Sequence, residues 1–210
     1  MKRIPWITIA MGVVALGIHA LGERASEALQ WHSELFASGQ LWRLVGGHLC
    51  HWDWNHLVWD LTAFVALGWI LERRLRESFL AALLLTAVAT EPLLRWTDAF
   101  ETYRGLSGFC VALFALALLK LLEAGRRKRD GLAVVGAAGG LVALVAKIAF
   151  EASAGLPLFA GGDGGFEVAV EAHLAGLLAG AISWLALRPR RGRRPVAEET
   201  SLDNIPTGRF

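Results

Sequence analysis

Long apolar runs are the feature that most constrains how this chain can fold. There are about six of them, each close to the roughly 20 residues that a helix needs to cross the bilayer core, and short polar stretches separate them. Hydrophobic residues make up 55% of the 210 positions and charged residues only 19%, which excludes an ordinary soluble globular domain. We therefore predict an all-α, polytopic membrane protein with six transmembrane helices, over residues 4–22, 54–71, 79–96, 107–122, 132–150 and 168–187.

The basic residues predict the orientation of these helices. They cluster before the first run and after the second, fourth and sixth, and loops rich in Lys and Arg stay in the cytoplasm. Both termini are therefore expected to be cytoplasmic. We predict one membrane domain, residues 1–187, and a disordered cytoplasmic tail, residues 188–210, which is first basic and then polar. The first run is longer than the apolar core of a cleaved signal peptide, so we expect it to remain as a helix.

Polar residues inside apolar runs are costly to bury, which makes them candidates for function. Such residues lie at the start of the second, fourth and sixth runs and inside the third: His48, His51, Asp53, Asn55, His56 and Asp60; Ser107; Glu171 and His173; and Glu91 beside Pro92. The second, fourth and sixth runs cross in the same direction, so their first halves share the outer leaflet. A helix over residues 107–122 would be only about 24 Å long, so its start would lie below the outer surface, in a pocket that water enters.

Serine and histidine in one wet pocket indicate nucleophilic catalysis. Ser107 would be the nucleophile and His173 the base that takes its proton. Gly105 and Gly108 would let a substrate approach the backbone, and the free amides at the start of the helix could stabilise an oxyanion. Gly176 and Gly180 would let the last helix pack closely against a neighbour and bring His173 near Ser107.

Other interpretations of these residues stay open. Small residues around a serine are common in packed membrane helices, and a histidine can have a purely structural role. His48, His51 and His56 with Asp53 and Asp60 suggest a metal site, although three histidines on one helix would be spread over about 140°. The Glu91-Pro92 pair would suit a broken transporter helix, but no internal repeat accompanies it, so a packed kink is preferred. Arg104 is expected on a wet rim, and Cys50 and Cys110 are expected to be small packing residues rather than a disulfide.

Taken together, the motifs resemble the rhomboid family of intramembrane serine proteases, over residues 42–180. Trp42-Arg43 resembles the family's Trp-Arg pair, and His51, His56 and residue 60 fall where the family has a His and a His-x-x-x-Asn. The resemblance extends to an acidic-basic helix end, a nucleophile motif and a base motif: Glu72-Arg73-Arg74, Gly105-Leu106-Ser107-Gly108 and His173-x-x-Gly176-x-x-x-Gly180. It implies a rhomboid-like helical bundle, a Ser107–His173 dyad without cofactor or metal, and an oxyanion hole made by the Ser107 amide, His56 and residue 60.

Two positions depart from the family pattern. Asp60 replaces the usual Asn. It would either donate a hydrogen bond to the oxyanion in its protonated form, orient His56, or only pack between helices. Val111 replaces a ring that often stacks on the base, so something else must orient His173.

The Arg104-Gly105-Leu106-Ser107-Gly108 string and the short body are similar to the rhombosortase branch of the family. This similarity implies single-pass membrane protein substrates with a C-terminal Gly-Gly motif, one apolar helix and a basic tail. It also implies a bacterial inner membrane with the site open to the periplasmic side. The expected partners are these substrates and lipid, with no nucleic acid. A catalytically inactive relative that binds membrane helices is the main alternative, and a metal-dependent membrane protein or transporter is a weaker one.

Overall fold

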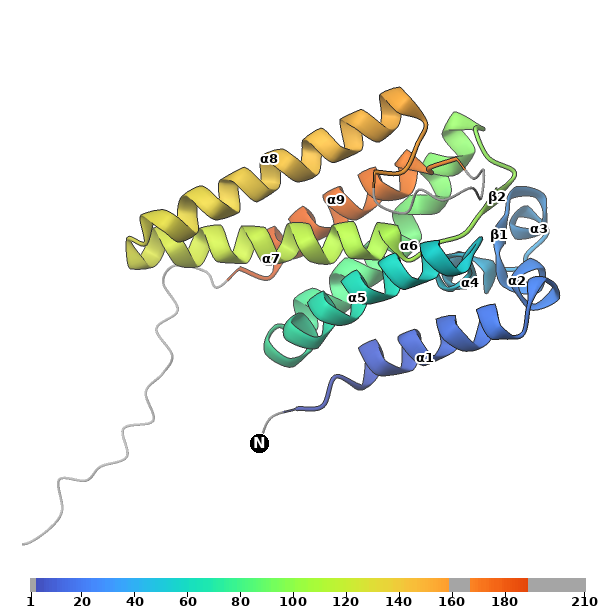
Figure 1. Ribbon diagram of the computed structural model, residues 1–210, viewed down its shortest axis with the longest axis horizontal. Coiled ribbons are helices and arrows are strands. Elements are labelled where there is room, and N and C mark those ends of the chain that lie inside the picture. The colour runs from blue at the N-terminus through green and yellow to red at the C-terminus, as the bar shows by residue number, and fades with distance from the viewer. Residues whose placement is uncertain (1–2, 159–166, 189–210) are drawn as a thin grey trace, which may run out of the picture.

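A computed structural model describes residues 3–158 and 167–188, which form a bundle of helices capped at one end by short elements (Figure 1). The predicted tail, residues 188–210, lies outside the described residues except for Arg188. The long helices are α1 (Trp6–Ala20), α5 (Trp54–Arg74), α6 (Arg76–Thr97), α7 (Ser107–Lys128), α8 (Gly131–Ala154) and α9 (Val170–Ala186). The short elements are α2 (Glu23–Leu29), β1 (Trp31–His32), α3 (Ser33–Ala37), α4 (Arg43–Leu49) and β2 (Thr102–Tyr103).

The long helices match the predicted apolar runs, which confirms the all-α membrane fold. Three of them, α6, α7 and α8, are long and apolar enough to cross a membrane on length and composition alone. Helices α1 and α9 are apolar but shorter. Helix α5 has 21 residues, but polar side chains begin it and Glu72, Arg73 and Arg74 end it.

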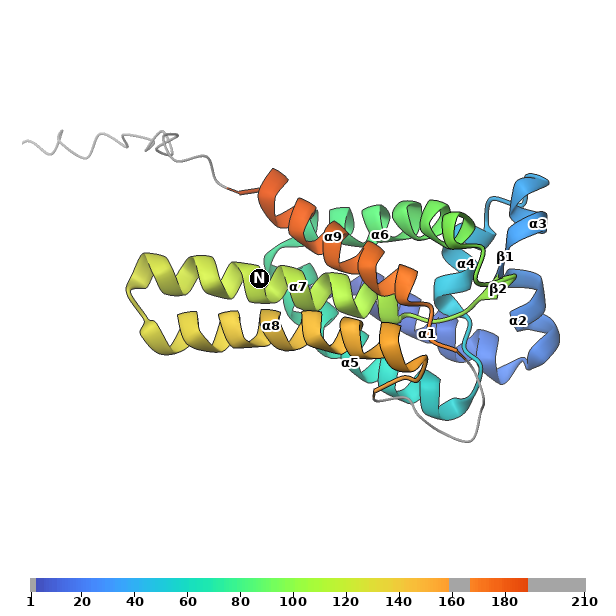
Figure 2. The ribbon, with the colours of Figure 1, turned by 90° about the horizontal axis from the view of Figure 1, so that it is seen from above.

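Helix α7 is the centre of the bundle, because it packs against α5, α6, α8 and α9 (Figure 2). Its buried side chains, including Phe109, Leu113 and Leu116, form the core with residues of α5 and α6 such as Phe64 and Phe79. Helix α9 runs alongside both α6 and α7. The residue that begins α7 is Ser107, so the most enclosed helix carries the candidate nucleophile at its first turn.

The predicted end of the fourth helix is wrong. Helix α7 continues past Leu122 to Lys128 and has 22 residues, so it is about 33 Å long rather than 24 Å. Its last turn carries Arg126, Arg127 and Lys128, which an apolar-run criterion cannot count. The length of α7 therefore does not by itself place Ser107 below the outer surface.

Residues 23–53, between α1 and α5, fold into a cap of three short helices and one strand. Strand β1 pairs antiparallel with β2, with Trp31 opposite Tyr103, so the cap is joined to the segment that leads into α7. Arg43 holds the cap together: its guanidinium donates to the carbonyls of Glu27 at 3.0 Å and Gln30 at 2.7 Å, at the end of α2.

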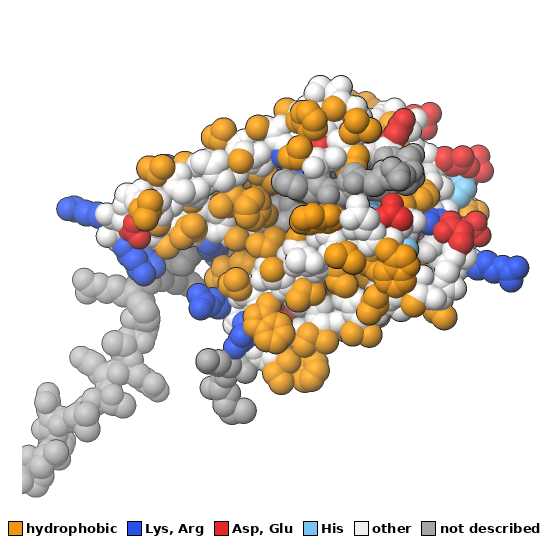
Figure 3. All heavy atoms as spheres, in the orientation of Figure 1, with side chains coloured by type: hydrophobic (Ala, Val, Ile, Leu, Met, Phe, Trp, Pro, Cys, Tyr) orange, Lys and Arg blue, Asp and Glu red, His pale blue; other side chains and the backbone are white. Residues whose placement is uncertain are grey.

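Charge separates the two ends of the bundle. Lys and Arg side chains gather at the end where α5 meets α6 and α7 meets α8, and acidic side chains are more frequent at the opposite end (Figure 3). The described basic clusters therefore share one end, as the sequence predicts. Which side of the membrane that end faces stays a prediction.

Candidate active site

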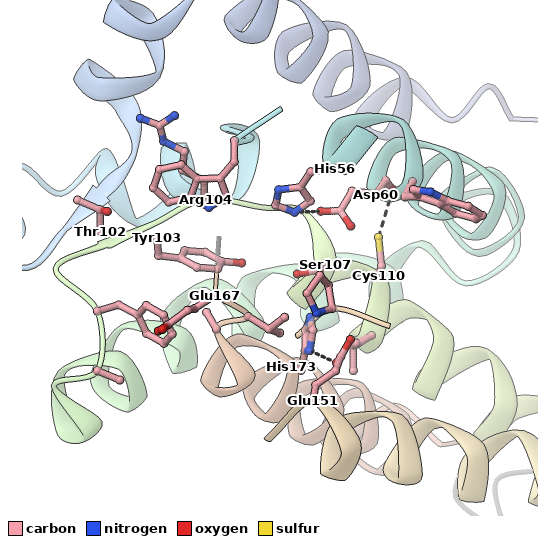
Figure 4. Close-up of a pocket in the computed structure, with 18 of the residues that line it drawn as sticks. His56, Asp60, Thr102, Tyr103, Arg104, Ser107, Cys110, Glu151, Glu167 and His173 are labelled. Atoms are coloured by element: carbon pink, nitrogen blue, oxygen red, sulfur yellow. Dashed lines mark hydrogen bonds and ion pairs between the residues drawn. The ribbon is translucent and has the colours of Figure 1, made fainter. Parts of the chain in front are cut away.

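A pocket of about 720 Å³ lies among the first half of α5, the first turns of α7 and α9, the end of α8 and residues 99–104, which lead into α7. Its lining includes Ser107, His173, His56 and Asp60, together with Glu151 from α8 (Figure 4). The structure thus brings four of the predicted site residues, from three helices, to one cavity.

The backbone before Ser107 has a conformation that needs glycine. Gly105 has φ +141°, and a Cβ there would lie 3.0 Å from His56 Nε2. Its carbonyl accepts a hydrogen bond of 2.7 Å from the Tyr103 hydroxyl, and its amide donates to the Gly47 carbonyl. These contacts fix the turn, so that α7 begins at Ser107 with its first amides free of helical partners.

The first turns of α7 and α9 are in backbone contact. A Cβ at Gly176 would lie 2.2 Å from the Gly108 carbonyl oxygen, and one at Gly180 would lie 2.4 Å from that of Ala112. A Cβ at Gly108 would lie 3.0 Å from the Ala172 carbonyl oxygen. Ser107 and His173 are the neighbours of Gly108 and Ala172, so this contact brings their side chains to the same side of the pocket (Figure 4).

His173 has a carboxylate partner that the sequence analysis missed. Its side chain is buried, and its Nδ1 lies 3.0 Å from Oε2 of Glu151, which is also buried. Lys147 lies one turn before Glu151 on α8, and its Nζ donates to both carboxylate oxygens at 2.6 and 2.7 Å. The available signal was a charged pair four residues apart, Lys147 and Glu151, near the end of the fifth apolar run.

His51, His56 and Asp60 form a second polar cluster across the pocket. The Asp60 Oδ2 atom lies 3.2 Å from His56 Nε2 and 3.4 Å from His51 Nε2. The Leu106 amide also points to His51 Nε2 at 3.4 Å, which the ring can accept only when that nitrogen carries no proton. Asp60 thus faces two imidazoles, and Asp53 caps α5 by accepting from the His56 amide at 2.8 Å.

The same cluster is the set of described residues that could hold a metal ion. Ligand atoms from His51, His56 and Asp60 all lie within 4.8 Å of one another. The expectation that His48, His51 and His56 share one helix is wrong, because His48 lies on α4 and His51 lies between α4 and α5. His48 instead stacks on Phe109 with a centroid distance of 4.1 Å, and its Nδ1 lies 3.1 Å from the Tyr103 hydroxyl. Burial lowers the pKa of His48 to about 4, so the ring is neutral.

Three of the predicted supporting residues, Trp42, Arg43 and Glu72, lie away from the pocket. Arg43 holds the cap, and Trp42 is exposed, with its indole N–H directed at the Ala28 carbonyl. Glu72 lies at the far end of α5, where it accepts hydrogen bonds from the Ile7 and Thr8 amides and the Thr8 hydroxyl. It therefore caps the start of α1, and its role is structural in this geometry.

The prediction that Arg104 lies on a wet rim is wrong. Its side chain is buried, donates to Gln30 Oε1 at 2.7 Å, pairs with Glu23 and lies over the Trp52 ring. The hydrogen bond from Arg104 holds the pKa of Glu23 below its usual value. Sequence alone could not show this, because Glu23 is 81 positions away. Cys50 and Cys110 are both free, as predicted.

Comparison with known proteins assigns the fold to a family. The profile of the Rhomboid domain matches residues 38–190, well over half of the chain. The chain belongs to the rhomboid family. This family consists of intramembrane serine proteases and also contains inactive relatives. No protein with a curated description matches the chain significantly.

Within this rhomboid, the two departures from the family pattern have structural counterparts. Asp60 contacts His51 and His56 rather than standing alone, which favours the orienting role over the donor role. Val111 is buried and lines the pocket, and Glu151 contacts His173 from α8.

Proposed function

We propose that this rhomboid is an intramembrane serine endopeptidase with Ser107 as nucleophile and His173 as base. The observation that supports it most is the backbone contact between the first turns of α7 and α9, beside a pocket that both side chains line. A serine hydroxyl becomes an effective nucleophile when a neighbouring imidazole takes its proton. The pocket also provides space for a peptide carbonyl, since it measures about 720 Å³.

The reaction would follow the order of general-base catalysis. Ser107 Oγ attacks the scissile carbonyl carbon while its proton passes to His173. The imidazolium then gives this proton to the leaving amine, and water hydrolyses the acyl-enzyme by the reverse route. In a sorting reaction another nucleophile would take the place of water.

The oxyanion would be held by the Ser107 amide and His56. The free amides at the start of α7 favour negative charge at this point. Gly105 lets the His56 ring lie close to the turn before Ser107, because a Cβ at position 105 would lie only 3.0 Å from His56 Nε2. Asp60 lies 3.2 Å from that nitrogen, so its carboxylate would orient the ring and share the Nε2–H with the oxyanion.

The proposed substrates are single-pass membrane proteins. The similarity of the Arg104 to Gly108 string to rhombosortases supports substrates with a C-terminal Gly-Gly motif, an apolar helix and a basic tail. The basic end of the bundle supports cytoplasmic termini, because loops rich in Lys and Arg stay inside. The pocket lies at the opposite end, so it would open to the periplasmic side of a bacterial inner membrane.

Labelling with a fluorophosphonate probe tests this function without a known substrate. The Ser107 oxygen attacks phosphorus, fluoride leaves and His173 takes the proton, so labelling reports both residues. We expect wild-type protein in detergent to label at Ser107, Ser107→Ala to lose the label and His173→Ala to label at least a hundredfold more slowly, since a general base contributes roughly 10²–10⁴-fold. Ser153→Ala is the matched control, because Ser153 is exposed at the end of α8.

The two alternatives give different results. An inactive relative would neither label nor cleave, although it would bind membrane helices. A metal-dependent enzyme using His51, His56 and Asp60 would lose activity with a chelator and keep it in Ser107→Ala. Either result would reject the serine mechanism.

A further inference from the structure

Glu151 is a buried acid that the Ser107–His173 mechanism does not use. Only 2% of its side chain is exposed, and α8 is one of the helices able to cross a membrane. A charged side chain in such a helix is costly unless it is paired, and it marks a functional candidate. Glu151 accepts from Lys147 and from the Leu158 amide at 3.1 Å, and its Oε2 lies 3.0 Å from His173 Nδ1.

We propose that Glu151 is the positioning residue of the base, so that the dyad works as a Ser107–His173–Glu151 triad. This inference rests on the proposed serine mechanism. A carboxylate beside Nδ1 keeps the proton on that nitrogen, which leaves the Nε2 lone pair to accept the Ser107 proton. It also stabilises the imidazolium that forms when Ser107 attacks.

The geometry supports this role for Glu151. Figure 4 shows Ser107, His173 and Glu151 in that order along one side of the pocket, on three different helices. The Nδ1–Oε2 contact is an ion-pair contact without an aligned hydrogen bond. Catalytic hydrogen bonds are often poorly aligned before substrate binds and tighten in the complex.

Val111 explains why this rhomboid needs such a partner. The residue is aliphatic and lies one turn after Ser107, so it cannot stack a ring on the imidazole. Glu151, on α8, contacts the imidazole at Nδ1. Orientation of the base is therefore supplied by a carboxylate instead of an aromatic ring.

The proton balance needs no additional group. The Ser107 proton moves to Nε2, and the same proton leaves with the departing amine. Glu151 stays ionised throughout. Before attack its charge is balanced by Lys147, 2.6 Å away. During attack the new imidazolium is balanced by the oxyanion, so the net charge of the pocket does not change.

Three variants separate positioning from packing. Glu151→Gln keeps the size and one acceptor oxygen but removes the charge. Glu151→Asp keeps the charge on a shorter side chain. Lys147→Gln removes the ion pair on α8 and leaves the carboxylate against His173. For each, the maximal inactivation rate (kinact) and the half-saturating concentration (KI) of a fluorophosphonate probe are measured in detergent, with the melting temperature (Tm).

We expect Glu151→Gln to lower kinact about a hundredfold, at the low end of the range for general acid–base catalysis, with KI changed less than about threefold. Glu151→Asp should recover part of kinact, and Lys147→Gln should lose far less than Glu151→Gln. A purely structural Glu151 would give a different pattern: equal losses in Glu151→Gln and Lys147→Gln, with KI or Tm changing in parallel.

The outcomes distinguish this inference from the proposed function. If wild-type protein labels at Ser107 and Glu151→Gln labels within threefold of its rate, the triad is rejected and the serine enzyme stands. If Glu151→Gln does not fold, Glu151→Asp against Lys147→Gln decides: a kinact that is no higher in Lys147→Gln than in Glu151→Asp rejects the triad. If wild-type protein does not label at Ser107, the function and the triad both fall.

Discussion

Replacing Gly176 by alanine tests how closely α7 and α9 must approach. The new Cβ would lie 2.2 Å from the Gly108 carbonyl oxygen, which is backbone and cannot rotate away. Contacts of 3.4 Å and above are ordinary for a Cβ, so the two helices must separate by about 1 Å at this turn. His173 lies one turn before Gly176 on α9, and it would move away from Ser107 with that separation.

This displacement should cost more in catalysis than in stability. A misplacement of about 1 Å in a catalytic group can lower the rate by roughly 10²-fold, equal to about 2.7 kcal/mol of activation free energy. Overpacking a well-packed interface costs about 1–3 kcal/mol of folding free energy, so a lower Tm is expected as well. We expect Gly176→Ala to fold and to label at Ser107 about a hundredfold more slowly than wild type.

Two further glycines provide the controls for this measurement. Gly180→Ala strains the same interface one turn further from the pocket, where the Cβ would lie 2.4 Å from the Ala112 carbonyl oxygen. It should lower Tm by a similar amount but reduce labelling less. Gly136→Ala on α8 meets nothing within 4 Å and should change neither. Wild-type labelling in Gly176→Ala, or an equal loss of labelling in Gly180→Ala, would refute the argument that this contact positions the base.

Three other predictions follow from single contacts, each measured on protein in detergent micelles. Glu72→Ala removes three hydrogen bonds to the start of α1 and should lower the free energy of unfolding by about 2–4 kcal/mol, whereas the exposed Glu77→Ala should change it little. In the folded protein, burial lowers the pKa of His48 to about 4, whereas in the unfolded chain this histidine takes up a proton near pH 6.5. Between these two pH values the proton stabilises only the unfolded chain. The free energy of unfolding should therefore fall by up to about 3 kcal/mol as the pH drops from 6.5 to 4. His48→Gln should lose that part of the pH dependence, and an unchanged slope of Tm against pH would contradict it. Asp60→Asn should keep the labelling rate within about threefold of wild type, because the amide oxygen can still accept a hydrogen bond from His56. Asp60→Ala should lower the labelling rate at least roughly tenfold. Equal losses of labelling in the two variants would show that the charge of Asp60 is required.

The sequence was sufficient to predict the long helices because their signal is local. Each apolar run reports its own helix, and the structure confirms the runs with ends that differ by a few residues. The main error is the end of α7, where Arg126, Arg127 and Lys128 continue the helix beyond the apolar part. The cap was not predicted, since α2, α3 and α4 are short helices without a long apolar face, and they are joined to the bundle by distant pairs such as Trp31 with Tyr103.

The candidate site was predictable only where one motif carries it. Ser107 and His173 lie in recognisable strings, and the structure brings both to one pocket, while their catalytic roles stay predictions. Glu151 was missed because its contact with His173 depends on how α8 packs; its neighbour Lys147 signals a charged pair but not that contact. Arg104 and His48 were misplaced for the same reason: their partners, Glu23 and Phe109, are far away in the chain.

The two buried carboxylates of the pocket support a common physical interpretation. A buried charge is tolerated only when partners compensate for the water it has lost, and removing one partner costs more than replacing the whole pair. Asp60 faces two imidazoles and Glu151 faces an imidazole and an ammonium group, so each carboxylate can gain from a proton that passes to its histidine. In the proposed mechanism, the charge of Asp60 beside the oxyanion would be offset by a proton on His56, whose Nε2 lies 3.2 Å from the carboxylate. The amide variants Asp60→Asn and Glu151→Gln keep the shape of the side chain and remove its charge, so they measure the electrostatic contribution. An alanine variant such as Asp60→Ala instead measures the cost of leaving a buried imidazole without its partner.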